Sequence, residues 1–348
     1  MSLSDRARPK RRNGAGRGAV TIFDVASAVG VATSTVSRAL TQPGRVSEAL
    51  RRRVATAAAE LGYFPNPQAR SLTSGRTQSI ALLVSDVTNP YFFDLIRGTQ
   101  ATAKARGYRH MLVNTENTEA STELEETALA ELPASVDGVV LTGSRLTDQQ
   151  ILKAAKRFPI VVVNREIDGV PSVVVDTSKG VEEALEYLVS LGHERIAFLA
   201  GPAWSWSSKR RWEALQAASR RLKVECINIG PRSGATQSGA AAADAAIHHG
   251  VTASLFFNDM LAIRALKRFA ERGVSVPGDM SVIGCDDIFG ADFCHPALTT
   301  LTSPIDQVGR IATDMLLTRL LGLPLARERE RIAAHLTIRD STGTARAK

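Results

Sequence analysis

The side chains best suited to chemistry form one cluster near the N-terminus of the 348-residue chain. At helical spacing, one exposed face of a helix here would carry Thr33, Ser34, Ser37 and Arg38. The apolar Val36 lies among them in the sequence and would point to the other side. Short hydroxyl side chains let a helix lie deep in the major groove of DNA, where base pairs differ in their donors and acceptors. An arginine that donates two hydrogen bonds to guanine gives about 1–3 kcal/mol of base discrimination. These residues predict a DNA-reading helix, and an ordinary surface helix with a solvated arginine is the alternative.

Two helices joined by a tight turn would have to position this face. Apolar residues recur at helical spacing in residues 22–29 and again in residues 33–40, where Val36 and Leu40 are expected to be buried. Gly30-Val31 separates the two segments, and glycine permits a sharp reversal because it adopts a positive φ without strain. The pattern predicts a helix-turn-helix.

A third helix is expected to complete a small core. Its apolar stripe steps by three or four residues and consists of Val46, Leu50, Val54, Ala57 and Leu61. Ser47 stands at the position expected for an N-cap. Three short helices would therefore enclose one small core.

The positive charge of the chain is concentrated at the same end. Residues 1–78 contain 13 Lys and Arg against 4 Asp and Glu, whereas the rest of the chain contains 30 against 31. A charge confined to one end is typical of a segment that binds a polyanion. Double-stranded DNA is favoured over a membrane surface, because no large basic amphipathic helix accompanies the charge. Residues 1–19, rich in Arg and Gly, are expected to be a disordered basic tail.

From residue 79 onward, short apolar runs alternate with segments of helical periodicity. The runs expected to be strands are residues 80–84, 111–113, 138–141, 160–163, 173–175, 196–200, 254–257 and 281–284. Such alternation is typical of βαβ units, in which helices cover both faces of a parallel sheet. Because this region is too long for one comfortable sheet, we expect two α/β lobes with a ligand cleft between them.

Other classes of function find no support in the sequence. The motifs GxxxxGK[ST], HExxH and GxSxG are absent. The adjacent pairs His248-His249 and Asp286-Asp287 would each point in different directions, so neither forms a joint site. Three cysteines without metal-ligand spacing are expected to be reduced thiols. We predict no enzyme activity, no cofactor and no metal, and, because no apolar segment follows the N-terminal charges, a cytoplasmic protein that does not bind membranes.

The residues around the predicted helix-turn-helix match a known family. The matching motifs are TIFDVA (residues 21–26), GV (30–31), STVSRAL (34–40), RVS (45–47), LGY (61–63) and PNP (65–67), and then NPYF (89–92), LGH (191–193), ND (258–259), GCDD (284–287) and IRDSTG (338–343). In order and spacing over about residues 20–343, the chain closely resembles the LacI/GalR family of bacterial repressors.

The resemblance implies a fold with two parts. A small all-α helix-turn-helix headpiece would occupy residues 20–64, and a hinge helix or linker would occupy residues 65–78. An α/β two-lobed effector domain like a periplasmic binding protein, which also forms the dimer, would occupy residues 79–343, with a short tail at 344–348. Its lobes would be joined by three crossovers, near Asp176, Phe289 and Leu323.

The resemblance also implies DNA contacts residue by residue. Base contacts would come from Thr33, Ser34 and Arg38, phosphate contacts from Thr21 and Ser37, and further contacts from Asn66 and Leu72 of the hinge. In the family the hinge leucine enters the minor groove, which agrees with the role of an apolar wedge that kinks a duplex; an ordinary linker leucine is the alternative. The family usually has serine where Ala32 stands, which removes a capping hydroxyl, with Thr33 as the alternative cap, and asparagine where Thr41 stands.

Seven positions match places that contact the effector in the family: Tyr91, Phe92, Asn164, Arg165, Arg211, Asn258 and Asp286. Trp206 is added as an eighth candidate, because its ring could stack on a sugar. Amide, carboxylate and guanidinium groups suit the vicinal hydroxyls of a sugar, and an aromatic ring can stack on a sugar face. A structural ion pair is the alternative for Arg211 and Asp286, and core packing is the alternative for Trp204 and Trp206.

The sequence thus predicts a transcriptional repressor that binds a palindromic operator of roughly 14–20 base pairs as a homodimer, because one headpiece contacts too few bases for genomic specificity. A sugar is expected to release it, and a corepressor-assisted regulator that responds to a purine or another metabolite is the alternative. A sugar-binding transport protein and a nonspecific architectural DNA-binding protein are the other classes. The basic headpiece disfavours the first, and the large effector domain disfavours the second.

Overall fold

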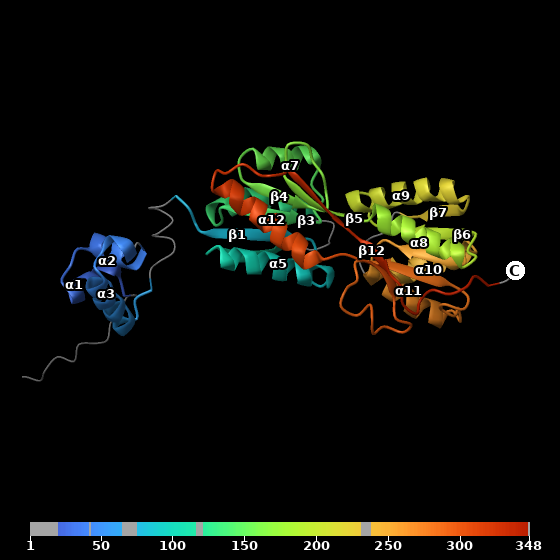
Figure 1. The fold of residues 1–348 in the computed structure, drawn as a ribbon, viewed down its shortest axis with the longest axis horizontal. Coiled ribbons are helices and arrows are strands. Elements are labelled where there is room, and N and C mark those ends of the chain that lie inside the picture. Colours follow the sequence, from blue (N-terminus) through green and yellow to red (C-terminus); the bar gives the residue numbers. More distant parts are fainter. Residues whose placement is uncertain (1–19, 42, 65–74, 116–120, 231–237, 347–348) are drawn as a thin grey trace, which may run out of the picture. The chain divides into compact units, whose positions relative to one another are not determined.

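The chain folds into two compact units, Met1–Thr77 and Gln78–Lys348 (Figure 1). The computed structural model describes residues 20–41, 43–64, 75–115, 121–230 and 238–346. One small hydrophobic core lies in the first unit, and four larger clusters lie in the second. No helix among the described residues is long and apolar enough to span a bilayer.

The described residues of the first unit form a bundle of three helices. They are α1 (Ile22–Val29), α2 (Thr33–Thr41) and α3 (Glu48–Leu61), with the 3-10 turn η1 (Pro43–Arg45) before α3. Gly30 ends α1 with a φ of 73°, which confirms the predicted turn and its need for glycine. Ser47 caps α3 as expected, because its hydroxyl accepts the N–H of Leu50 at 3.4 Å.

The core of this unit differs from the expected one at two points. Ala39 and Ala58 are buried, whereas Leu40 is only half-buried and Leu61 is 39% exposed. The expectation that both leucines are buried is therefore wrong. Small residues let the helices approach closely, so the larger side chains next to them are left at the rim.

The first lobe of the second unit is built on a six-stranded parallel sheet of order β11-β5-β4-β3-β1-β2. Its strands are β1 (Ser79–Val84), β2 (Arg109–Asn114), β3 (Gly138–Thr142), β4 (Ile160–Val163), β5 (Ser172–Asp176) and β11 (Arg329–Ala333). Alternate residues of β1 face opposite sides, as the period of a strand requires: Ile80 and Leu82 belong to one core cluster, and Ala81 and Leu83 belong to another.

Four helices cover the two faces of this sheet. One face is covered by α5 (Tyr91–Ala105) and α12 (Ile305–Leu320), and the other by α6 (Ser121–Glu131), the 3-10 turn η2 (Leu132–Ala134) and α7 (Asp148–Ala155). Helix α12 comes from the C-terminal part of the chain, yet it packs beside α5 (Figure 1).

The second lobe repeats this architecture. Its sheet has the order β12-β10-β9-β8-β6-β7, with β12 antiparallel to β10. The elements are α8 (Ser178–Ser190), β6 (Arg195–Leu199), α9 (Trp206–Leu222), β7 (Glu225–Ile229), α10 (Ser238–His248), β8 (Ala253–Phe256), α11 (Asp259–Glu271), β9 (Ser281–Cys285), β10 (Thr299–Thr302) and β12 (His335–Thr337). Helices α8 and α9 cover one face, and α10 and α11 cover the other.

Along the described residues of the second unit, the chain passes between the lobes three times. The first passage follows Asp176, as expected, between β5 and α8. The second lies between β10 and α12, near residue 303, and the third lies between β11 and β12, at Ala334. The expected crossovers at Phe289 and Leu323 are wrong, because β10, β11 and β12 each extend a sheet after those positions.

Candidate nucleic-acid interface and ligand pocket

The exposed face of α2 carries the side chains expected to read DNA. Ser34, Ser37 and Arg38 are exposed and Thr33 is half-buried, while Val36 is fully buried in the core. Arg38 forms no ion pair with any residue that the structure describes. Its guanidinium is therefore available to an acceptor outside the protein.

The start of α2 presents backbone N–H groups beside this face. The carbonyl of Ala32 accepts the N–H groups of Thr35 at 2.9 Å and Val36 at 3.1 Å, which places Ala32 at the N-cap. Alanine has no acceptor for the first N–H groups of the helix, and Thr33 already lies inside α2, so it does not replace the cap. Unpaired N–H groups at the positive end of the helix dipole suit a phosphate.

Thr21 is held by its own helix. Its backbone N–H and its hydroxyl both donate to the carboxylate of Asp24, at 2.8 and 2.7 Å. The hydrogen bond from the backbone N–H is the main reason why the pKa of Asp24 is lowered. The hydroxyl proton of Thr21 is thus committed to Asp24, and any phosphate contact of Thr21 requires it to turn away.

A second arginine of the first unit connects α3 to α1. Arg53 of α3 donates from Nη2 to the carbonyl of Val29 at 3.0 Å, at the C-terminal end of α1. A cation at this end of a helix is favourable for the helix dipole. This contact fixes the residue that precedes the turn and therefore the entry into α2. The two remaining predicted DNA contacts, Asn66 and Leu72, lie outside the described residues.

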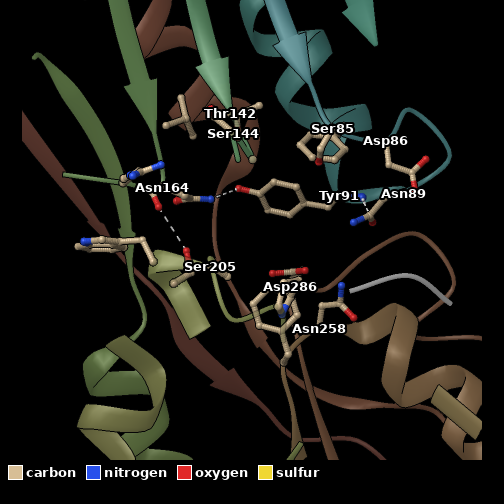
Figure 2. A pocket seen from close by; sticks show the side chains of 18 of the residues that line it. Ser85, Asp86, Asn89, Tyr91, Thr142, Ser144, Asn164, Ser205, Asn258 and Asp286 are labelled. Carbon is tan, nitrogen blue, oxygen red and sulfur yellow. Dashed lines mark hydrogen bonds between the residues drawn. The ribbon is translucent and has the colours of Figure 1, made fainter. Parts of the chain in front are cut away.

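The second unit contains a pocket lined by residues of both lobes (Figure 2). Its volume is about 140 Å³, and a cavity of about 150 Å³ holds one six-membered ring. The structure brings all eight predicted effector positions to this pocket: Tyr91, Phe92, Asn164, Arg165, Trp206, Arg211, Asn258 and Asp286. They lie at or after the carboxyl ends of strands or in the first two turns of helices, as expected for open α/β sheets.

Arg211 and Asp286 form the charged wall on the side of the second lobe. The Nη2 of Arg211 lies 3.7 Å from Oδ1 of Asp286, and its Nη1 donates to the carbonyl of Phe257. Arg211 is only 6% exposed, and its Nε has no hydrogen-bond partner among the described residues. Burial raises the pKa of Asp286 to about 7 although Arg211 opposes the shift. The pair therefore offers one donor and one poised carboxylate to a ligand.

Three neighbouring acids differ in their partners. Asp286 lines the pocket, whereas Asp287 accepts hydrogen bonds from Arg339 at 2.7 Å and from Thr302 at 2.9 Å. Asp259 is fully buried and accepts the hydroxyl of Thr300 at 2.6 Å, and burial raises its pKa to about 6. Asp287 and Asp259 are thus structural, and only Asp286 remains for a ligand.

Tyr91 and Asn164 form the facing wall in the first lobe. Figure 2 shows the Tyr91 ring pointing toward Asn164, whose Nδ2 donates to the phenol oxygen at 2.5 Å. The Oδ1 of Asn164 accepts the N–H of Val175 at 3.0 Å, and its backbone has a φ of 59°. Burial raises the pKa of the Tyr91 phenol, so it remains a neutral donor. A ligand between the lobes would meet Tyr91 on one side and Asp286 on the other.

The other four predicted positions are partly committed to the fold. Arg165 donates to the carbonyl of Leu146 at 2.6 Å and pairs with Asp148 at 2.5 Å, so its charge is already used. Phe92 is 5% exposed and packs edge-on against Tyr91. The remaining two have local partners: Asn258 caps α11 through Leu261, and Trp206 lies under Arg210.

Several lining residues were missed by the sequence analysis. They include Ser85, Asp86, Asn89, Thr142, Ser144 and Ser205, which Figure 2 labels, and Ser207. A signal existed for Ser85 and Thr142, because each is a polar residue at the end of an apolar strand whose carboxyl end faces the pocket. No group of three or more potential metal ligands occurs among the described residues.

Comparison with known proteins identifies the family. The model of "Bacterial regulatory proteins, lacI family" matches residues 21–66, and that of "Periplasmic binding protein-like domain" matches residues 185–342. The HTH-type transcriptional repressor CytR of Escherichia coli (strain K12) is 32% identical, over 93% of this chain and 96% of the relative. The chain belongs to the lacI family. It is a DNA-binding transcriptional regulator with a periplasmic-binding-protein-like effector domain, and not an enzyme.

Solved structures of lacI-family proteins share this architecture. The Lac repressor dimer bound to operator and the anti-inducer ONPF has a TM-score of 0.83 and 27% identity, and the match covers 94% of this chain and 100% of that chain. A lacI-family regulator from Enterococcus faecium with bound ribose has a TM-score of 0.68 and 26% identity, over 77% of this chain and 100% of that chain. The recognised fold class is therefore confirmed.

Proposed function

We propose that this lacI-family repressor binds a palindromic operator as a homodimer and that a sugar in the pocket of the second unit releases it. The observation that carries the proposal is the polar pocket itself. Arg211 and Asp286 of one lobe face Tyr91 and Asn164 of the other across a space for about one ring. A ligand that contacts both walls would favour one arrangement of the lobes, and this gives it a means of control over DNA binding.

The chemistry of the pocket supports a neutral polyol. Arg211 and Asp286 carry opposite charges, so a ligand need bring no net charge. The buried Nε of Arg211 lacks a partner among the described residues, and an unpaired buried donor is costly until an acceptor such as a hydroxyl oxygen reaches it. The carboxylate of Asp286 can accept hydrogen bonds from the hydroxyl groups of such a ligand. The ribose-bound regulator from Enterococcus faecium supports the choice of a monosaccharide.

The geometry of the first unit supports a dimer on a twofold site. The reading face consists of a few side chains on the nine-residue helix α2, too few for a specific site in a genome. Two such faces would read an inverted repeat of roughly 14–20 base pairs.

The second unit also supports a dimer. Met111 and Leu112 of the edge strand β2 are 39% and 42% exposed, and a partner subunit would cover them. The dimeric Lac repressor on operator supports the same assembly. Asn66 and Leu72 remain proposed operator contacts, and the cytoplasm is the proposed compartment.

The direct test is selection of DNA sequences by the full-length protein, followed by release with metabolites. The expected selected site is an inverted repeat that the dimer binds more tightly than a scrambled duplex. A panel of pentoses, hexoses and purines is then titrated into the complex and followed by fluorescence anisotropy. Asp286→Asn is titrated in parallel as the pocket variant, and its unfolding transition is measured to check that it is folded. Release by a sugar in the wild-type protein alone supports the proposal. Tightening by a purine would instead identify a corepressor, and selection of no repeat would refute operator binding.

A further inference from the structure

One pair of side chains joins the two lobes beside the pocket. Arg145 follows β3 in the first lobe, and Trp204 precedes α9 in the second. The guanidinium carbon of Arg145 lies 5.3 Å from the centroid of the Trp204 ring, within the range of a cation–π interaction. Trp204 also lines the pocket and is 39% exposed. It therefore stands where the pocket meets solvent.

The loop that carries Arg145 is fixed by a buried acid. Glu125 of α6 is 1% exposed, and its carboxylate accepts the hydroxyl of Ser144 at 2.6 Å and the backbone N–H of Arg145 at 3.1 Å. The N–H of Leu146 in turn donates to the hydroxyl of Ser144 at 3.1 Å. This network holds the backbone of Arg145 in place, so only a small entropy cost remains when its side chain is ordered against Trp204.

The segment that carries Trp204 is fixed in a similar way. The hydroxyl of Ser205 accepts the N–H of Ser208 at 3.2 Å and so caps α9. The hydroxyl of Ser208 accepts the N–H of Gly201 at 3.0 Å, which ties the start of the helix to the end of β6. Both members of the pair are therefore presented by rigid backbone, one from each lobe.

A second Arg–Trp pair in the same region stays within one lobe. Arg210 lies 5.7 Å from the centroid of the Trp206 ring, and both residues belong to α9. Trp206 lines a second small pocket together with Asp176 and Thr177, at the first crossover. Of these two Arg–Trp contacts among the described residues, Arg145–Trp204 joins a residue of the first lobe to one of the second, and so it must break when the lobes separate.

We propose that Arg145 and Trp204 form an interlobe clasp, a pair that stabilises the closed arrangement of the lobes and strengthens the response to the effector without contacting the effector's hydroxyl groups. The effect on the response rests on the proposed function, whereas the effect on lobe closure does not. A ligand that contacts both lobes binds more tightly when the closed arrangement is more populated. A cation–π pair at a partly exposed site corresponds to about a two- to fivefold change in that population.

The first test measures the lobes of the full-length protein without any effector. Spin labels attached through p-acetylphenylalanine at Lys153 of α7 and Lys209 of α9 leave the native cysteines untouched and report the distance between the lobes. Arg145→Ala and Trp204→Ala should each broaden the distance distribution toward longer values. Arg221→Ala, a control on the same helix α9 whose partners Glu182 and Glu186 belong to the same lobe, should leave it unchanged. Arg145→Lys should restore part of the short-distance population. Unchanged distributions in both alanine variants would overturn the clasp.

The second test measures affinity for the sugars that bind the wild-type protein. Arg145→Ala and Trp204→Ala should each weaken every sugar by the same factor, about two- to fivefold, and the double variant should lose no more than either single one. A loss that differs from sugar to sugar, or additive losses, would show that these residues contact the ligand and would overturn the proposal. If no sugar binds the wild-type protein, the proposed function fails, while the distance measurement still decides the clasp.

Discussion

The two units use their key arginines in opposite ways. Arg38 of the first unit is exposed and unpaired among the described residues, above a core of a few small side chains. Arg211 of the second unit is only 6% exposed and contacts Asp286 and the carbonyl of Phe257. The contrast implies that the first unit can change its DNA specificity without changing its stability. The pocket has no such freedom, because its ligand-binding groups also hold the fold.

The largest expected effect comes from Arg211→Ala. Removal of the guanidinium leaves the buried carboxylate of Asp286 without its counter-ion and the backbone carbonyl of Phe257 without its hydrogen-bond donor. Breaking a buried ion pair in this way costs about 3–5 kcal/mol of folding stability. The free energy of unfolding, measured by denaturant titration of the full-length protein, should fall accordingly, and sugar binding should be lost.

Arg221→Ala is the matched control on the same helix. Arg221 is exposed and bridges Glu182 and Glu186, so its removal should change stability little. Equal losses in the two variants would contradict the view that burial makes Arg211 structural.

The next effect is a dependence of stability on pH in the second unit. The pKa of Asp286 is raised to about 7 and that of Asp259 to about 6, both by burial. Because these pKa values lie above that of an unfolded aspartate, their contribution to stability is fully present below about pH 4. It is lost as the pH rises to about 7, at no more than about 1.4 kcal/mol per pH unit for each group.

The variant Asp286→Asn separates the contribution of Asp286 to this pH dependence from that of Asp259. Thermal unfolding of both proteins between pH 4 and pH 8 should show the wild-type protein losing stability relative to the variant as the pH rises. In the wild-type protein, a sugar whose hydroxyl groups donate hydrogen bonds to Asp286 favours the ionised carboxylate. Sugar binding near pH 6–7 should therefore release a proton from Asp286, which calorimetry in buffers of different ionisation enthalpy detects. Parallel pH profiles would show that Asp286 has an ordinary pKa.

A smaller effect, on binding alone, is expected for Arg38→Ala. Loss of a two-bond contact with guanine costs about 1–3 kcal/mol, roughly 5- to 150-fold in affinity for the selected operator. Because Arg38 is exposed, the unfolding transition should not move. Anisotropy titrations on the operator and on a scrambled duplex give the two affinities. An equal loss on both duplexes would make Arg38 a phosphate contact.

The sequence predicted the central strands of both sheets and one edge strand, β2. All eight expected strands exist: seven are largely buried apolar runs, whereas β2 lies at an edge of its sheet with Met111 and Leu112 exposed. The strands β7, β11 and β12 lie at edges and are half polar, so their pattern has no clear period. Strand β10 contains Thr299 and Thr300, which are buried because they bond Thr342 and Asp259, partners that no local pattern reveals. The misplaced crossovers have the same cause.

For the candidate site, the sequence predicted which residue types gather but not what each one does. All eight expected positions line the pocket, since the ends of parallel strands meet at one edge. The structural pairing of Arg165 with Asp148 and the contact of Trp204 with Arg145 depend on loops far apart in the sequence. The exposed face of α2 in the first unit was easier to predict, because the spacing of residues alone decides which side chains share a helix face.

The smallest expected effect restores a hydroxyl to the first unit. Ala32 occupies the N-cap of α2 without an acceptor, so Ala32→Ser should stabilise this unit by about 1 kcal/mol. Hydrogen exchange of the amides of α1–α3 in the full-length protein should slow about fivefold, while amides of the second unit stay unchanged. The same hydroxyl adds a donor near the helix start, so affinity should rise on operator and scrambled duplex alike. A gain on the operator alone would mean that this position reads bases, and the reading face would then extend beyond the four residues of α2.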